Sequence, residues 1–131
     1  MTDTLNWVMS MAFVGGPTIS ASDHVEAEAY EKIEAIIPEG SVPTTVNVQP
    51  SLLTELQAII IIAERYEDLT FEVDSEGITK TLDGPLMLIG PGNIGNLGAT
   101  VNDLIFANAD ADDSNMVTIL VARTAIEPLG E

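Results

Sequence analysis

The chain lacks cysteine and contains a single histidine, His24. Without thiols it has no disulfide, no thiolate metal site and no cysteine nucleophile. One histidine also removes most histidine-dependent acid–base and metal chemistry. Aromatic residues make up only 5% of the chain, whereas hydrophobic residues reach 46%. We therefore expect an aliphatic core, and a chain of this length can bury roughly two thirds of the surface that its unfolded form exposes.

Basic residues are also scarce. Four Lys and Arg stand against 21 Asp and Glu, which gives a formal net charge of -17. Nucleic-acid binding depends on clustered basic side chains that displace counterions from phosphates, so we expect no nucleic-acid partner. Anionic membranes are disfavoured for the same reason. The acidity is compatible with solubility alone, including in a saline habitat, or with a cationic ligand, a divalent metal or a capsid lattice.

The sequence shows no features of a targeting segment or of a second domain. The apolar stretch 7–14 follows an acidic start, Met1-Thr2-Asp3-Thr4, and is too short to span a bilayer. We expect no signal peptide and no membrane anchor. Because no repeat, linker or low-complexity tract divides the chain, residues 1–131 are expected to form one domain with extended terminal arms at 1–4 and 125–131.

Alternating side chains indicate β-structure. Heavy side chains alternate with small or polar ones from Leu5 to Phe13, and again from Leu69 to Val73. A turn at 74–77 then predicts a hairpin with 78–82. Turn-forming residues recur along the chain at the spacing of a sandwich or barrel.

Other segments complete a β-rich prediction. The apolar runs 58–63, 86–89 and 116–122 are short and bounded by turns, which is typical of strands buried on both faces, and 101–107 is expected to add a strand. Segment 25–37 fits both helical and strand periodicity, and its polar parity favours a strand. A short helix is expected over 51–57, with Ser51 as N-cap. The predicted fold is an all-β antiparallel sandwich or jelly-roll-like domain with at most one or two short helices.

A glycine-rich segment formally matches a dinucleotide-binding fingerprint. Gly90-Pro91-Gly92-Asn93-Ile94-Gly95 reads G-x-G-x-x-G, follows an apolar run and lies twenty residues before Asp110. Such a site also needs further parallel strands and crossover helices, and only 36 residues follow Gly95. We therefore interpret the segment as a long surface loop, and we expect no nucleotide and no cofactor.

Two further groups of residues bear on chemistry. Asp110, Asp112 and Asp113 offer hard oxygen ligands suited to a cation, but they lack the spacing of an EF-hand, so a solvated turn is the favoured interpretation. Asp23 and His24, near Ser20 or Ser22, can be drawn as a hydrolytic triad, but triads need rigidly placed partners that are distant in sequence. We expect no catalytic residues and no enzyme activity.

Two stripes of residues, one charged and one apolar, are the remaining candidates for a functional surface. Glu26, Glu28, Glu31 and Glu34 are expected to form a solvated face that discourages sheet-edge pairing. Core packing is the commoner fate of an apolar stripe, but Trp and Met are enriched at interfaces. The candidate interface residues are Trp7, Met9, Met11 and Phe13.

The second half of the chain has the order strand, glycine-rich loop, strand, acidic turn and closing strand. These elements lie in 82–92, Leu104-Ile105-Phe106-Ala107-Asn108 and Ile119-Leu120-Val121-Ala122-Arg123. In this pattern the chain resembles small β-sandwich structural proteins of tailed-phage virions, of the head decoration or cement kind. The resemblance implies a protein present in many copies, made in the host cytoplasm and located in the virion. Its implied partners are copies of itself, including a trimer, and the major capsid protein or another virion protein. It brings no catalytic residue.

A different class of function fits the same composition. A small acidic β module that binds carbohydrate or calcium would need accessible aromatic rings or a cation site. Only Trp7, Tyr30 and Tyr66 could supply a glycan platform through Trp or Tyr rings. The exposure of these rings therefore distinguishes the two functions.

Overall fold

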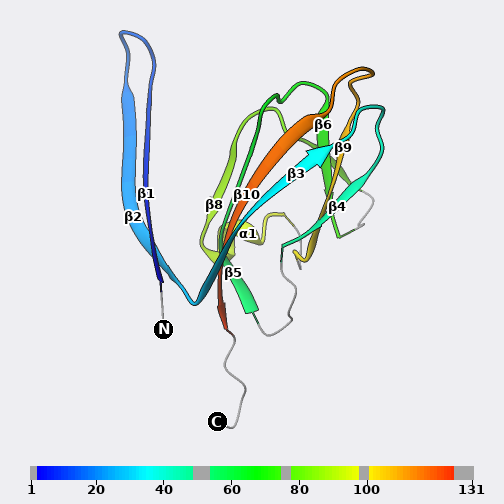
Figure 1. Cartoon of the computed structure of the whole chain (residues 1–131). Helices are drawn as coiled ribbons and strands as arrows, with labels where there is room; N and C mark the ends of the chain where they lie inside the picture. Colours follow the sequence, from blue (N-terminus) through cyan, green and yellow to red (C-terminus); the bar gives the residue numbers. More distant parts are fainter. Residues whose placement is uncertain (1–2, 49–53, 75–77, 98–100, 126–131) are drawn as a thin grey trace.

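The computed structural model describes residues 3–48, 54–74, 78–97 and 101–125. Within these ranges the chain forms two four-stranded antiparallel sheets that pack against each other, together with a two-stranded hairpin (Figure 1). The all-β sandwich expected from the sequence is confirmed. Among the described residues no helix is long and apolar enough to cross a membrane.

The first sheet has the strand order β3-β10-β5-β8. Its strands are β3 (Ala29–Ile37), β10 (Asn115–Ala125), β5 (Thr54–Ala63) and β8 (Leu86–Ile89). The central pair β10 and β5 is antiparallel, with a register irregularity between Ala122 and Arg123. Such bulges bend a strand and strengthen its local twist.

The second sheet has the strand order β4-β9-β6-β7. Its strands are β4 (Thr44–Asn47), β9 (Asp103–Asn108), β6 (Leu69–Val73) and β7 (Thr79–Thr81). The antiparallel pairing of β6 with β7 confirms the predicted hairpin. Residues 75–77 of its turn lie outside the described part.

The core fills the space between the two sheets with aliphatic side chains. Ile59, Ile61 and Ile119 of the first sheet are fully buried, as are Leu104 and Phe106 of the second. The ring of Phe106 lies 6.0 Å from the ring of Phe71, centroid to centroid. Each such side chain contributes about 1.5–3 kcal/mol through burial, so this one cluster is the main source of stability.

The long apolar strands are fully buried on both faces only around Ala58 and Ala122. The expectation of burial on both faces was wrong for the rest of these strands. In β10, Val117, Ile119 and Val121 are fully buried, whereas Met116, Thr118 and Leu120 on the other face are half-buried. In β5 and β8, Ile62 and Met87 remain 45% and 40% exposed. The expectation assumed a layer on each side of the sheet. The described part of the sandwich has two layers, so the outer face of the first sheet has little protein over it.

Two local predictions need correction. The segment 25–37 is extended, as favoured, but it is two strands divided at Glu28. Residues 54–57, expected in a helix, belong to strand β5 because they pair with β10, while 51–53 lie outside the described residues. The glycine-rich loop contains α1 (Pro91–Ile94), a single helical turn that follows Gly90, whose φ is 95°.

The hairpin consists of β1 (Asp3–Ala12) and β2 (Thr18–Ala27), which pair with each other along their whole length. It projects away from the sandwich, so that the two form a V that is open at the top of Figure 1. We call this hairpin the arm. The sequence also predicted extended chain ends at 1–4 and 125–131. Asp3, Thr4 and Ala125 belong to strands, and the other residues of these two segments lie outside the described part.

Candidate interaction surface

One face of the arm is apolar. Strand alternation places Leu5, Trp7, Met9 and Met11 on the same side of β1, opposite Val25, Asp23, Ala21 and Ile19 of β2. We call the apolar members of this face the arm stripe. No residue of the stripe belongs to the main core cluster, and Leu5 packs against the smaller buried cluster at the base of the arm. The sequence grouped Trp7, Met9 and Met11 correctly, but it favoured the core as their place.

Exposure of the arm rises toward its tip. Leu5, Trp7 and Met9 are half-buried, whereas Met11 is 64% exposed. Phe13 does not continue the stripe, since it follows β1 in the turn, where its carbonyl accepts the Gly16 N–H at 2.9 Å. It is exposed beside Val14. Phe13 is therefore a tip residue, separate from the arm stripe.

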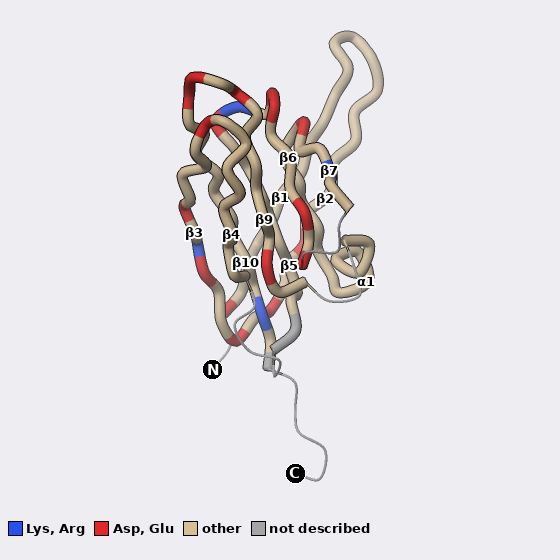
Figure 2. Tube along the Cα trace, turned by 90° about the vertical axis from the view of Figure 1, so that its right-hand side faces the viewer, with Lys and Arg blue, Asp and Glu red and all other residues tan. Residues whose placement is uncertain are grey.

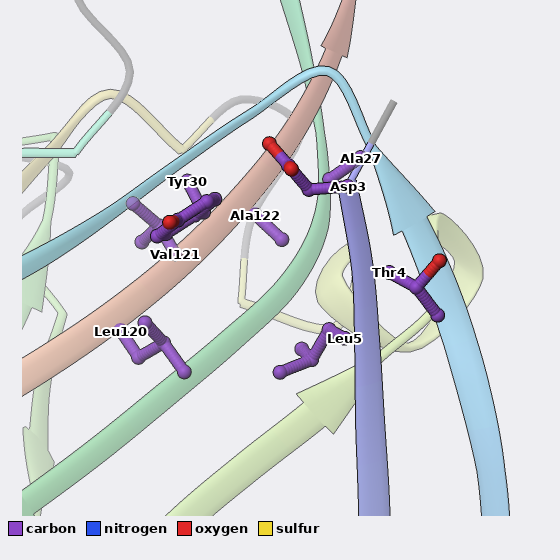
Figure 3. Close-up of a pocket in the computed structure, with 8 residues that line it drawn as sticks. All are labelled: Asp3, Thr4, Leu5, Ala27, Tyr30, Leu120, Val121 and Ala122. Carbon is purple, nitrogen blue, oxygen red and sulfur yellow. The ribbon is translucent and has the colours of Figure 1, made fainter. Parts of the chain in front are cut away.

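The root of the arm packs on the sandwich through small residues. Ala27 of β2, Ala58 of β5 and Ala122 of β10 form a second buried cluster, against which Leu5 and Ile60 pack. Beside it lies a hollow of about 300 Å³. Figure 3 shows Leu5 and Leu120 among the residues that line it. The hollow is the closed end of the V.

Backbone contacts fix the angle between the arm and the sandwich. Only Glu28 separates β2 from β3, and its N–H donates to the Arg123 carbonyl at 2.8 Å. The Arg123 side chain is 10% exposed. Its Nη1 donates to the Val48 carbonyl at 2.7 Å, and its Nη2 lies 3.6 Å from a carboxylate oxygen of Glu31. This buried arginine therefore holds β3, β10 and the segment after β4 together at the arm root.

The other wall of the V is also apolar. The outer face of the first sheet presents a group of apolar side chains that strand register places side by side, which we call the sheet patch. Its members are Ile60, Ile62, Met87, Ile89 and Leu120. Met87 pairs with Ile60, and Ile60 with Leu120, so the patch crosses three strands. The apolar runs 58–63, 86–89 and 116–122 predicted strands buried on both faces. They did not indicate that this face of the sheet is open.

The sheet edges differ in charge. Glu31 and Glu34 lie on β3, an edge strand of the first sheet, with Lys32 3.5 Å from Glu34. This agrees with the solvated acidic face expected from the sequence. Glu26 and Glu28, the other two residues of that expected face, are also exposed. The opposite edge strand, β8, has no charged residue. An uncharged edge is the one more open to pairing with another chain.

The acidic loop is closed by its own contacts. One carboxylate oxygen of Asp110 accepts the N–H groups of Asp112 and Asp113 at 2.8 and 3.0 Å, and the other lies 3.2 Å from Arg65 Nη1. The backbone donors, and next the arginine, lower the pKa of the Asp110 carboxyl. Among the described residues no group of three His, Cys, Asp or Glu side chains is arranged to hold a metal ion. The structure therefore uses Asp110 to fold the turn.

Arg65 connects this turn to the end of β5. Its Nη2 also donates to the carbonyls of Asp113 and Ser114, and Asn115 exchanges two hydrogen bonds with its backbone. The fully buried Asn108 donates to the Asp113 carbonyl at 2.8 Å. None of these long-range pairings could be inferred from the sequence.

Replacing Asp110 by alanine is expected to lower the free energy of unfolding in a pH-dependent way. Because the folded-state pKa is lowered, the carboxylate stabilises the fold above the unfolded-state value of about 3.9. This contribution disappears as the pH falls through the lower folded-state value. Urea unfolding of wild type and Asp110→Ala should differ at pH 7 and converge in strong acid. Asp112→Ala is the matched control, and an equal loss in that variant would contradict this account.

The remaining sequence candidates do not form a site. His24 and Asp23 are exposed neighbours on the arm, with His24 Nδ1 3.4 Å from the Asp23 carboxylate. Of the three rings that could bind glycan, Trp7 is half-buried, Tyr66 packs on the core and Tyr30 is exposed. They do not present a shared platform.

Comparisons with protein-family models, curated proteins and solved structures found no match. The arm and the sheet patch are the structural features that bear most directly on function.

Proposed function

We propose that this chain is a non-enzymatic structural subunit that acts by assembling with copies of itself and with a larger protein lattice. The observation that carries the proposal is the arm, a two-stranded sheet that leaves the sandwich (Figure 1). Its apolar face is half-buried near the root and uncovered toward the tip, where Met11 and Ile19 are 64% and 63% exposed. A two-stranded hairpin alone is at best marginally stable in water. Such an arm gains stability when another surface covers its apolar face.

Two hollows at the arm also favour binding to protein surfaces. The hollow at the arm root is lined mainly by apolar residues. A second hollow, at the arm tip, is lined by Met11, Ala12, Phe13, Pro17, Thr18 and Ile19. Catalytic pockets combine an apolar lining with a few convergent polar or titratable groups. The tip hollow has no titratable side chain in its lining, which fits a protein contact better than chemistry.

The specific role that we propose is a virion structural protein, a capsid decoration or cement protein that binds the major capsid protein. Its support is the sandwich fold, the resemblance in residues 82–123 and the acidity. An outer position on the particle suits a chain of net charge -17, because packaged DNA would repel it. The proposed partners are further copies and a capsid protein, with no catalytic step.

Self-association is expected to strengthen as salt is added. Copies of net charge -17 repel one another, and at 0.15 M salt this repulsion is screened over a Debye length of about 8 Å. Apolar burial of about 25 cal/mol per Å² is not weakened in this way. Sedimentation equilibrium in about 0.02, 0.15 and 1 M salt should show an average mass that rises with salt concentration, because each step shortens the Debye length. An average mass that falls with salt would indicate charge-driven contacts instead.

The virion role is tested on the particle. We expect mass spectrometry of purified particles that carry this gene product to find it at a fixed ratio to the major capsid protein. The purified chain should also bind particles stripped of it. Its absence from the particle, together with failure to bind stripped capsids, would exclude the virion role and leave self-association to be judged separately.

A further inference from the structure

The two walls of the V are apolar, and one chain brings them together only at the root. The arm stripe includes Leu5, whose side chain points toward the first sheet in Figure 3. The other stripe residues of β1 lie on the same side of the strand. Contact between arm and sheet is centred on the cluster of Ala27, Ala58 and Ala122. Beyond this root, Met11 and Ile19 of the arm and Ile62 of the sheet are 64%, 63% and 45% exposed. Both walls therefore have room for another surface.

The V cannot close on itself without cost. Because β2 runs into β3 through Glu28 alone, moving the arm onto its own sheet would change the backbone at that residue. It would also disturb the hydrogen bond from Glu28 N–H to the Arg123 carbonyl and the alanine cluster. Both losses would disfavour the closed arrangement, because a native hydrogen bond and a packed contact would be given up. The open V is therefore the arrangement that the root stabilises.

Charge points to a second copy of the same chain as the partner. From Thr4 to Ser22 the sequence has no ionisable side chain, and the same is true of 56–63 and 84–102, which contain most of the sheet patch. In Figure 2 the outer part of the arm has neither acidic nor basic residues. Two chains of net charge -17 meet with least repulsion where both surfaces are uncharged. A basic partner would gain nothing at these surfaces.

We propose that the arm stripe of one copy docks on the sheet patch of a second copy, and that the second copy returns the same contact. This inference rests on the proposed self-association and specifies the surfaces that make it. Each copy contains both an apolar arm and an apolar receiving face. The exchange is therefore self-complementary, as a two-fold dimer requires.

The size of the arm sets an upper limit on the area that such a dimer buries. Ten residues of strand span about 33 Å, and two strands are about 10 Å wide, so one face of the arm covers roughly 330 Å². Two arms docked along their whole length on two sheets would bury at most about 1,300 Å², because Leu5, Trp7 and Met9 are already half-buried in one copy. This upper limit lies within the range of stable protein interfaces.

Cysteine cross-linking tests the proposal directly, because the chain has no native thiol. One preparation carries Met11→Cys on the arm stripe, and an isotopically labelled one carries Met87→Cys on the sheet patch. The two are mixed, equilibrated and treated with a short bismaleimide. Val8→Cys, on the opposite face of β1 and 79% exposed, replaces Met11→Cys as the matched control. Circular dichroism checks that each variant is folded.

We expect labelled-to-unlabelled cross-links between position 11 and position 87, with a yield roughly 100-fold above that of the Val8→Cys control. Docking raises the effective concentration of the two thiols from micromolar to millimolar. The chain carrying both substitutions should link between chains, not within one. Cross-links confined to single chains would overturn the proposal in favour of an arm that closes on its own sheet.

Two other results separate this inference from the proposed function. If copies associate but position 11 links to position 87 no better than position 8 does, the docking surfaces are wrong while self-association stands. If the mixture contains only monomers at every salt concentration, both the docking and the self-association are excluded.

Discussion

Replacing Trp7, Met9 and Met11 together by serine should convert associated copies into monomers while leaving the sandwich folded. These three side chains form the centre of the arm stripe, and they lie outside the main core cluster. Each buried apolar side chain contributes about 1.5–3 kcal/mol to an interface. Losing three should therefore raise the dissociation constant roughly 1,000-fold or more.

The matched control removes three apolar side chains from other exposed positions. Val8, Val42 and Ile78 are 79%, 52% and 60% exposed. Val8 lies on the opposite face of β1 from the stripe, and the other two lie outside the strands of the sandwich. The dissociation constant of this triple-serine control should match that of wild type. An equal loss of association in both variants would mean that general surface hydrophobicity, and not the arm stripe, holds the copies together.

The second large effect is expected in the core. Phe106→Ala should lower the free energy of unfolding by about 3–5 kcal/mol, the usual cost of removing a buried phenylalanine ring. Phe106 is fully buried and its ring lies 6.0 Å from that of Phe71. Trp7→Ala, although it removes a larger ring, should cost only about 1 kcal/mol in the monomer. Urea unfolding at a concentration where both variants are monomeric measures the difference. Equal losses would place Trp7 in the folding core and contradict the open arm.

Strand identity could be predicted because period-two alternation is a local property. Leu69, Phe71 and Val73 alternate with polar residues, and the structure buries all three. The paired strand after the turn was predictable for the same reason. The single helical turn after Gly90 was not, since it depends on how the loop returns to Gln57, whose carbonyl accepts the Gly90 N–H.

The layer that covers each strand face could not be predicted. The run from Ala58 to Ala63 contains apolar residues at every position, so it gives the same signal whether its second face meets its own chain, another chain or water. The arm shows the same limit, because alternation grouped Trp7, Met9 and Met11 but did not say whether they face a core. Whether these side chains face a core depends on where the arm lies relative to the sandwich. That placement is set by the single-residue connection at Glu28.

Long-range polar contacts could not be predicted from the sequence either. Arg65 and Asp110 lie 45 residues apart, and Arg123 and Val48 lie 75 apart. The acidic loop therefore gave a metal-site hypothesis, although its first carboxylate is engaged by Arg65 and by backbone N–H groups. Scarce basic residues in an acidic chain are informative once the structure is known, because these two arginines each hold several segments together.

The most direct test of arm-mediated assembly is the mass of the protein in solution. Multi-angle light scattering should be run at 1 M salt on the wild-type chain and on the variant with serine at 7, 9 and 11, at one concentration; charge repulsion is then screened within about 3 Å. The wild type should have a mass that is a multiple of 13.9 kDa, and the variant a mass of 13.9 kDa. A wild type that remains at 13.9 kDa would contradict self-association, and an associated variant would contradict the role of the arm.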